Sequence, residues 1–405
     1  MCNYLKIVLS CETKKTMKQL FYFKSTKMKK LLFRTAILSV LLSVIMTSNI
    51  DAQEFKIRGR LHMDSFFGLS DAEEFSNGFN NRRARLGAGG TINEKWDGRI
   101  EVDFADEGIS ANDFRLRGKF DHGGRIWIGQ FKVPQGLNQL TSSNEITFIE
   151  RSSISNVIAP ARRMGVAYEL GLGDAGLKTM LFGRALGERG IFQTDEEGYH
   201  NNMPLGIALR GYYGAPVGEG VFHVGASVVY EDFNDNNGLR LRDRPEARDS
   251  RGGAVRLIDV SLPNAENTTK FGLELLFISG AFSIEGEYMQ MGVSNVDMDD
   301  ASFSGYHVQT SYVLTGESRS YSGGAVGGIR PANESGAWEI AARYSVMDLN
   351  DDIYLGGKQS TITFALNHYV TNRLRFMANV IYVDIDRGDY DKSPLLGVLR
   401  AQYNF

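Results

Sequence analysis

Cysteine is almost absent from this sequence. The 405 residues include only two, Cys2 and Cys11, and both lie close to the N-terminus. The remainder of the chain therefore cannot build a disulfide framework, a cysteine metal site or a thiol nucleophile, and it offers no cysteine for a lipid anchor. Proline is also scarce, with 8 residues against 45 glycines, while 42% of the residues are hydrophobic. This composition excludes a collagen-like or disordered chain and predicts a large ordered fold.

Long apolar runs are missing as well, apart from one near the N-terminus. Residues 28–52, "MKKLLFRTAILSVLLSVIMTSNIDA", have a basic start, an apolar core and a small residue at the end, the pattern of a secretory signal peptide. We expect translation to begin at Met28 and cleavage to follow Ala52. A retained anchor is the alternative, but the apolar core is short for a spanning helix. Residues 53–405 would then be a single mature domain, either soluble in an exported compartment or crossing a membrane without helices.

Positive charge is in short supply once the N-terminal region is removed. Residues 1–52 contain nine of the 45 Lys and Arg residues and two of the 48 acidic residues, which leaves 36 against 46 and a net charge of -10. A nucleic-acid partner is not expected for a chain of this sign.

Alternation between apolar and polar residues dominates what remains. In "FKIRGRLHMD" at residues 55–64 every second side chain is apolar or small and the others are charged or polar, as in a strand with one greasy face. The pattern recurs along the chain and predicts about sixteen strands, at residues 55–64, 83–92, 96–104, 113–120, 125–131, 164–170, 177–183, 204–213, 221–230, 270–277, 282–289, 306–314, 338–345, 361–369, 373–384 and 399–405.

Two all-β folds fit such a series, a soluble sandwich and a transmembrane antiparallel β-barrel. The polar face of several strands carries two or three charges, the apolar face ends in Trp, Tyr or Phe, and tight turns such as "DHGG" contrast with the long polar stretch at residues 231–268. These features favour a barrel with a wet lumen, aromatic girdles, short turns at one end and long loops at the other. An exported soluble sheet protein is the alternative.

The connection between the fifth and sixth predicted strands, residues 134–163, is too long for a hairpin and suggests a functional loop. Ser142 and Glu145 could form a capping box that begins a short helix with an apolar side at Ile146, Phe148 and Ile149. Folded into the barrel, such a loop would narrow it. The charged residues then expected near the constriction are Glu145, Glu150, Arg151, Arg162 and Arg163. A loop lying over the barrel mouth is the alternative.

The stretch "NNRRARLGAGG" at residues 80–90 combines arginines with glycines but does not predict a nucleotide-binding loop. Such a loop requires a helix after the glycines, whereas another alternating strand follows at Trp96. The glycines are better interpreted as small residues in a curved wall where another element packs closely. By alternation Arg83 and Arg85 face the lumen, and Arg82 is expected near the rim.

Several motifs resemble one known family. They are "RRARLGAGG", "RIEVDFA", "GQFKVPQGLNQLTSSNEITFIERS", "APARRMGV", "YVLTGESR", "GAWEIAARYS" and the terminal "QYNF". Together they look like the phosphate-selective porin O and P family, and the match is spread over nearly the whole mature chain. The resemblance implies a homotrimer of sixteen-stranded barrels in the outer membrane of a Gram-negative bacterium, with the third loop folded inward.

The resemblance also implies passive diffusion of small anions, phosphate or polyphosphate, along lumenal arginines. Guanidinium groups suit this role because their planar forks match phosphate oxygens and closely spaced sites let an ion move on. The candidates on the polar faces of the strands are Arg58, Arg60, Arg83, Arg85, Arg115, Arg117 and Lys119. Each could instead pair with a lumenal carboxylate such as Glu101 or Asp103. The final Phe405 has the form of a signal for the barrel-assembly machinery.

Other functions fit the residues less well. The mature chain is acidic and Glu285 and Glu287 are expected in the lumen, so a general or differently selective porin is the main alternative to a phosphate channel. A barrel-embedded hydrolase needs a histidine beside a serine, and the six histidines share no motif and no metal-ligand spacing. We therefore predict no enzyme activity, catalytic residues, metal or cofactor. A non-conducting structural barrel is the third possibility.

Overall fold

The computed structural model describes residues 55–105, 108–186, 194–195, 198–199, 204–234, 238–296, 298–388, 390 and 392–405. Phe55–Phe405 forms one compact unit. The predicted signal peptide, the proposed start at Met28 and both cysteines lie outside the described residues. Within the described residues, no helix is long and apolar enough to cross a membrane.

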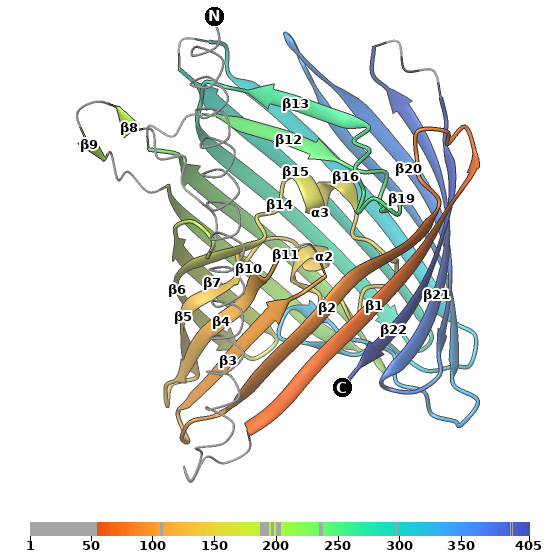
Figure 1. Ribbon diagram of the computed structural model, residues 1–405. Helices are drawn as coiled ribbons and strands as arrows, with labels where there is room; N and C mark the ends of the chain where they lie inside the picture. Colours follow the sequence, from red (N-terminus) through yellow and green to blue (C-terminus); the bar gives the residue numbers. More distant parts are fainter. Residues whose placement is uncertain are drawn as a thin grey trace, which may run out of the picture. The chain divides into compact units, whose positions relative to one another are not determined.

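Sixteen antiparallel strands form a closed barrel, as predicted (Figure 1). In order around the wall they are β1 (Phe55–Ser70), β2 (Gly78–Thr91), β3 (Trp96–Asp103), β4 (Ser110–Lys119), β5 (Gly124–Lys132), β6 (Arg162–Leu172), β7 (Ala175–Phe182), β10 (Leu205–Val217), β11 (Gly220–Asp232), β14 (Ala265–Ser279), β15 (Phe282–Asn295), β16 (Ala301–Val313), β19 (Ala337–Asp351), β20 (Tyr354–Tyr369), β21 (Leu374–Asp386) and β22 (Leu395–Asn404). Pairing of β1 with β22 closes the ring. The described residues also form three two-stranded sheets that are not part of the barrel sheet. They are β8 (Thr194–Asp195) with β9 (Gly198–Tyr199), β12 (Leu239–Asp243) with β13 (Ile258–Leu262), and β17 (Tyr321–Ser322) with β18 (Ala325–Val326).

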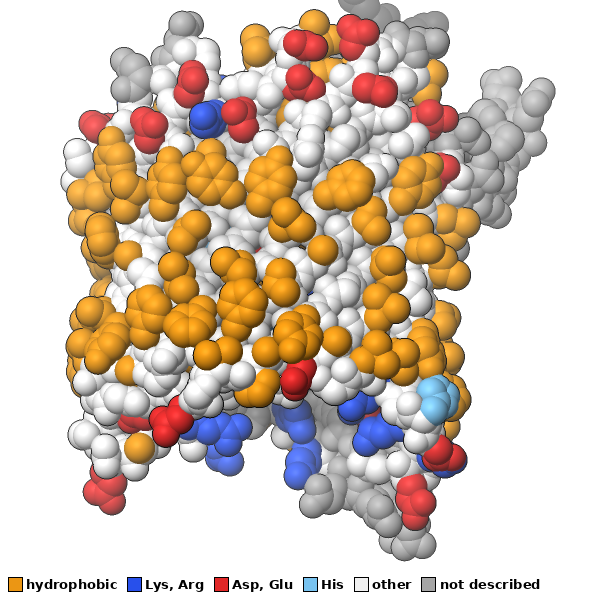
Figure 2. Space-filling model, turned by 180° about the vertical axis from the view of Figure 1, so that it is seen from behind, with side chains coloured by type: hydrophobic (Ala, Val, Ile, Leu, Met, Phe, Trp, Pro, Cys, Tyr) orange, Lys and Arg blue, Asp and Glu red, His pale blue; other side chains and the backbone are white. Residues whose placement is uncertain are grey.

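Side chains alternate between the lumen and the outer surface along each barrel strand. On β11, His223 is fully buried whereas its neighbour Val224 is 44% exposed. Figure 2 shows one side of the outer wall, where hydrophobic side chains form a broad belt and charged side chains gather above and below it. This arrangement is the one expected when lipid surrounds the wall and water the two rims.

The alternation changes character near the long-loop ends of β15, β16 and β19. There the inward side chains are apolar, for example Met291, Phe303 and Leu349, and they pack against Ile258 and Leu262 of the β12–β13 hairpin. The stretch at residues 231–268 is therefore not only a polar loop. Its middle is an apolar hairpin that removes part of the inner wall from water, which stabilises its packing there.

The connection from β5 to β6, here called the 133–161 segment, contains two short helices, α2 (Leu137–Leu140) and α3 (Ser153–Val157). The helix predicted to begin at Ser142 is wrong. Residues 144–150 stay non-helical because inward side chains of the wall donate hydrogen bonds to their carbonyl oxygens. The donors are Gln402 to Asn144, Arg375 to Ile146, Asn367 to Thr147, Arg400 to Ile149 and Arg343 to Glu150. Carbonyls engaged in this way are not available for helical hydrogen bonds.

One connection at the end of the barrel where β1 begins and β22 ends is not short. Residues 314–336, between β16 and β19, include the β17–β18 hairpin. Arg319 of this segment is buried, donates to Glu339 of the wall at 2.6 Å and donates to the backbone oxygen of Glu145 at 3.1 Å. The expectation that every turn at this end is tight therefore fails at this connection, which bonds directly to the 133–161 segment.

Candidate functional site

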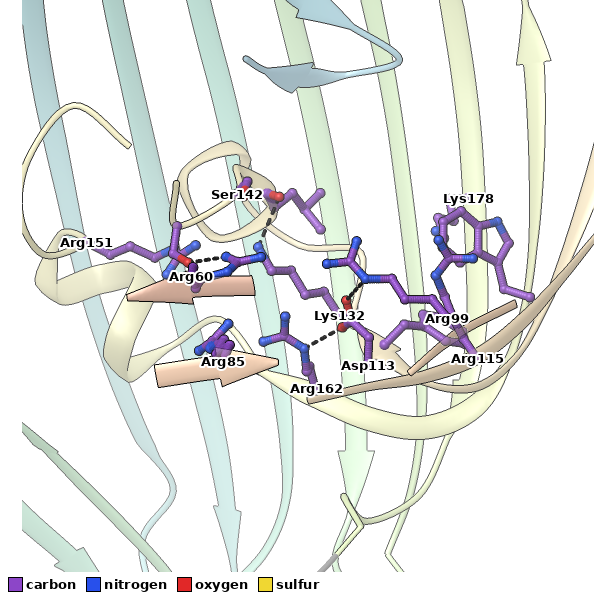
Figure 3. A pocket seen from close by; sticks show the side chains of 14 residues that line it. Arg60, Arg85, Arg99, Asp113, Arg115, Lys132, Ser142, Arg151, Arg162 and Lys178 are labelled. Atoms are coloured by element: carbon purple, nitrogen blue, oxygen red, sulfur yellow. Dashed lines mark hydrogen bonds and ion pairs between the residues drawn. The ribbon is translucent and has the colours of Figure 1, made fainter. Parts of the chain in front are cut away.

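A basic cavity of about 270 Å³ lies between the wall formed by β1 to β7 and the 133–161 segment. Eight of its 14 lining residues are basic and one is acidic; the basic residues are Arg60, Arg85, Arg99, Arg115, Lys132, Arg151, Arg162 and Lys178, and the acid is Asp113. Figure 3 shows these side chains converging on one space from the wall and from the segment. The cavity is consistent with the predicted arginine-lined lumen.

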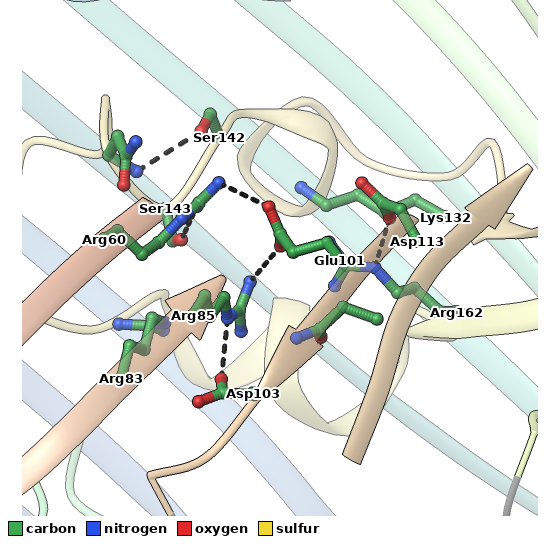
Figure 4. A network of polar contacts seen from close by, with 12 residues as sticks. Arg60, Arg83, Arg85, Glu101, Asp103, Asp113, Lys132, Ser142, Ser143 and Arg162 are labelled. Atoms are coloured by element: carbon green, nitrogen blue, oxygen red, sulfur yellow. Dashed lines mark hydrogen bonds and ion pairs between the residues drawn. The ribbon is translucent and has the colours of Figure 1, made fainter. Parts of the chain in front are cut away.

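Alternation on the first strands supplies one side of this cavity. Arg60 on β1 stands opposite Arg85 on β2, and both project to the lumen face. Arg60 donates to Ser143 Oγ of the 133–161 segment at 2.7 Å and to Glu101 at 3.1 Å, while Arg85 donates to Asp103 at 2.6 Å (Figure 4). The guanidinium groups are thus oriented by the wall and by the segment together.

The carboxylates of this region are shared between cations. Glu101 lies within ion-pair distance of Arg60, Arg85 and Arg99, and Asp113 within that distance of Arg99 and Arg162. One negative charge shared by two or three positive charges orients the guanidinium groups without neutralising them all. The local field therefore stays positive although the mature chain is acidic, because nearby charges dominate the potential in a cleft.

Lys132 and Arg151 are held by backbone oxygens instead of carboxylates. Lys132 Nζ donates to the carbonyl oxygens of Gln139, Leu140 and Thr141 at 2.6 to 3.1 Å, and Arg151 donates to that of Thr141 at 2.7 Å. Among the described residues no carboxylate forms an ion pair with either side chain. Burial, opposed by the Glu150 carboxylate and aided by the Arg162 guanidinium, lowers the pKa of Arg151 to about 9. Both basic side chains line the cavity together with Arg162.

A bulge in β2 brings two consecutive arginines to the lumen. His62 pairs with Arg83 but Met63 pairs with Asn81, so Arg82 is an extra residue on β2. Arg82 forms a bidentate pair with Glu150, which corrects its expected position near the rim. Burial alone would raise the pKa of Glu150, but the Arg82 and Arg83 guanidiniums hold it well below its usual range. Glu150 therefore anchors the 133–161 segment to the wall.

The glycines of the same strand fit the interpretation of close packing. A Cβ on Gly87 would lie 2.5 Å from the carbonyl oxygen of Ile100 on β3, closer than a side chain tolerates. The absence of a side chain at this position lets the two strands approach.

Some predicted residues lie outside the cavity. Arg58 and Lys119 are exposed and are not among its lining residues. Arg117 pairs with Asp97 at 2.7 Å, and Arg163 lies 3.7 Å from Glu231 of β11. Glu145 contributes its backbone oxygen to Arg319. Their place on the pathway stays a prediction.

Sequence reasoning missed several residues that line the cavity, among them three cations, one acid and one tryptophan. Arg99 and Asp113 lie on polar faces of predicted strands and could have been included by the alternation alone. Lys132 follows the motif "GQF", and Lys178 and Trp127 lie on strands whose lumenal side was not assigned. Whether these residues line the cavity depends on the tilt of the strands and on the part of the wall that the 133–161 segment approaches. The alternation of apolar and polar residues gives neither. Among the described residues no three His, Asp or Glu side chains form a group that could hold a metal ion.

A sixteen-stranded barrel with an apolar outer belt and a basic cavity inside it defines a channel protein of the outer-membrane porin class. The family model for "Phosphate-selective porin O and P" matches residues 55–405, so the chain belongs to this family. It is 27% identical over 409 residues to porin O of Pseudomonas aeruginosa, covering 87% of this chain and 88% of that protein.

Solved structures of other porins share the fold at lower sequence identity. The anion-selective porin of Comamonas acidovorans matches with a TM-score of 0.54 and 13% identity, over 87% of this chain and 99% of that one. OmpT of Vibrio cholerae in its trimer form matches with a TM-score of 0.54 and 14% identity, over 88% of this chain and 100% of that one. Family and fold are those of a channel rather than an enzyme.

Proposed function

We propose that this protein is a passive channel for small anions, phosphate among them, and that the solute passes along the basic cavity between β1 to β7 and the 133–161 segment. The observation that carries the proposal is the excess of cations, since eight basic side chains and one carboxylate line the cavity. Arginine forks suit the oxygens of phosphate, and several neighbouring sites of moderate strength allow an ion to enter and leave.

The 133–161 segment forms the constriction in this proposal. Arg151 and Ser143 approach the pathway from the segment, and Arg60 and Arg162 approach it from the wall. Glu150 acts there through its pairs with Arg82 and Arg400, which hold the segment in place. The prediction that Glu145 and Arg163 lie near the constriction is part of the same proposal.

The native assembly is proposed to be a homotrimer in the outer membrane, in contact with its lipids. The likeness to the trimer form of OmpT supports this assembly. Export would use residues 28–52 as a signal peptide, residues 53–405 would be a single barrel domain, and the terminal Phe405 would be recognised by the barrel-assembly machinery.

A porin of different anion preference is the second candidate. The carboxylates of Glu101 and Asp113 stand beside the pathway and bind the arginines that phosphate would use. A multiply charged anion must compete with these carboxylates for the arginine N–H donors. Chloride or a monocarboxylate needs fewer donors and would therefore pass more readily.

The reversal potential of the purified protein in planar bilayers tests the proposal. In a gradient of potassium chloride we expect an anion-selective potential, followed by inhibition of the chloride current when phosphate is added. Chloride selectivity without phosphate inhibition would favour the second candidate. A cation-selective or non-conducting protein would refute anion transport.

A further inference from the structure

Trp127 on β5 lies among cations and has no part in the function as described so far. Its half-buried ring lines the basic cavity. Lys178 Nζ lies 3.6 Å from the ring centroid, and the guanidinium carbons of Arg115 and Arg117 lie 4.5 and 5.3 Å from it. The arginines come from β4, on one side of β5, and the lysine comes from β7, beyond the other side. The indole therefore lies where basic side chains from two parts of the wall meet.

The charged groups on the two sides of Trp127 each keep an excess of positive charge. Asp97 is shared by Arg115 and Arg117 at 3.1 and 2.7 Å. Glu169 is shared by Lys178 and Arg125 at 3.3 and 2.9 Å. Two net-positive groups brought together repel each other, and a third carboxylate between them would remove the repulsion together with the charge. An aromatic ring attracts both through its quadrupole and carries no charge of its own.

We infer that Trp127 is a positioning residue of the anion pathway, which holds Lys178 and Arg115 at the cavity wall without neutralising them. This inference rests on the proposed function and adds the means by which the wall keeps its positive charge. Selectivity would thus depend on a neutral side chain as well as on the cations. A phenylalanine, which keeps an aromatic face, should largely replace Trp127, and a leucine of apolar character should not.

Variants at this position test the inference in planar bilayers. For Trp127→Leu we expect the anion-to-cation permeability ratio to fall about threefold, the effect of losing a partly desolvated cation–π contact, and for Trp127→Phe about half of that loss or less. Trp338→Leu is the matched control, because Trp338 lies on the outer wall and stacks on His368 at 4.1 Å. All variants are first checked for heat-dependent mobility on gels, the sign of a folded barrel.

If Trp127→Leu folds and keeps the selectivity of the parent, the inference is wrong while the proposed function stands. Equal losses in Trp127→Leu and Trp127→Phe would also contradict it, since they would show a requirement for shape and not for an aromatic face. A parent without anion selectivity would overturn both.

Fluorescence separates the local electrostatics from transport. The sequence has three tryptophans, so a Trp96→Phe/Trp338→Phe variant retains Trp127 alone. In detergent, we expect iodide to quench this residue at least about threefold more strongly than caesium, because the surrounding cations concentrate anions. Phosphate at constant ionic strength should reduce the iodide effect. Equal quenching by both ions would contradict the placement of Trp127 among positive charges that dissolved ions can reach, even if the channel conducts.

Discussion

At the scale of single residues, position on the strand decides whether an arginine belongs to the pathway. Arg58 and Arg60 lie on the same face of β1, two residues apart. Arg60 lines the cavity and binds Ser143 and Glu101, whereas Arg58 lies outside the cavity and is exposed. Alternation gives both the same face and cannot rank them, because depth along the lumen depends on where the 133–161 segment approaches the wall.

This difference predicts unequal effects of two alanine substitutions. Arg60→Ala should raise the phosphate concentration needed for half-inhibition of the chloride current about tenfold, as expected for the loss of a charge-assisted hydrogen bond. Arg58→Ala, the matched control, should change it about twofold or less because exposed charges are screened. Current titrations in planar bilayers measure both values. Similar effects of the two substitutions would argue against the cavity as the phosphate site.

At the scale of elements, segments between the strands are shaped by the wall they meet. The 133–161 segment has helical signals at Ser142 and Glu145, yet its carbonyl oxygens bind wall side chains and the helix does not form. The β12–β13 hairpin is fixed in a comparable way. Glu246, in the loop between β12 and β13, pairs with Arg343 of β19 and accepts a hydrogen bond from the backbone of Ser153 at 2.8 Å.

The hairpin also carries a pH dependence that can be measured. Burial raises the pKa of Asp243 to about 7, and its carboxylate accepts a hydrogen bond from Asn156 of α3 at 3.2 Å. Since the unfolded value is about 3.9, ionisation opposes the packed state. The packing should be strongest below about pH 4, weaken as the pH rises to about 7 and stay constant above that, by a free energy on the order of 4 kcal/mol at most.

Asp243→Asn should therefore raise the temperature of heat-induced unfolding at pH 8 and leave it nearly unchanged at pH 4, as followed by gel mobility. Asp259→Asn in the same hairpin is the control. The hydrogen bond from Arg240 holds the pKa of Asp259 below its usual value, so this variant should lower the unfolding temperature at pH 8. A pH response of Asp243→Asn equal to that of the parent would contradict the assignment.

At the scale of the whole molecule, the lumen is divided between a packed region and a charged region. Apolar inward side chains of β15, β16 and β19 pack on the β12–β13 hairpin. Basic side chains line the wall from β1 to β7. The net charge of the chain therefore says little about the solute, since the charges nearest the pathway dominate the field along it.

Selectivity produced by such a field should depend on salt. The Debye length falls from about 10 Å at 0.1 M to about 3 Å at 1 M, so the anion-to-cation permeability ratio should drop severalfold over this range. Reversal potentials at a fixed concentration ratio and increasing mean concentration measure the change. A ratio that does not vary with salt would indicate selection by size in place of charge.

The sequence alone determined the barrel and its orientation of side chains. Alternation placed all sixteen wall strands, and it assigned Arg60, Arg85 and Arg115 to the lumen because a strand has only two faces. The family motifs agreed with this prediction. These features depend on local pattern, and they are therefore visible in the order of residues.

Only the tertiary structure decided which of those side chains share a space. The bulge that turns Arg82 inward, the carbonyl oxygens that take up Lys132, and the ring of Trp127 between β4 and β7 all depend on contacts between distant segments. So does the wall that prevents a helix after Ser142. A sequence pattern gives each strand its two faces, but the height at which a loop meets the wall is set by packing in three dimensions.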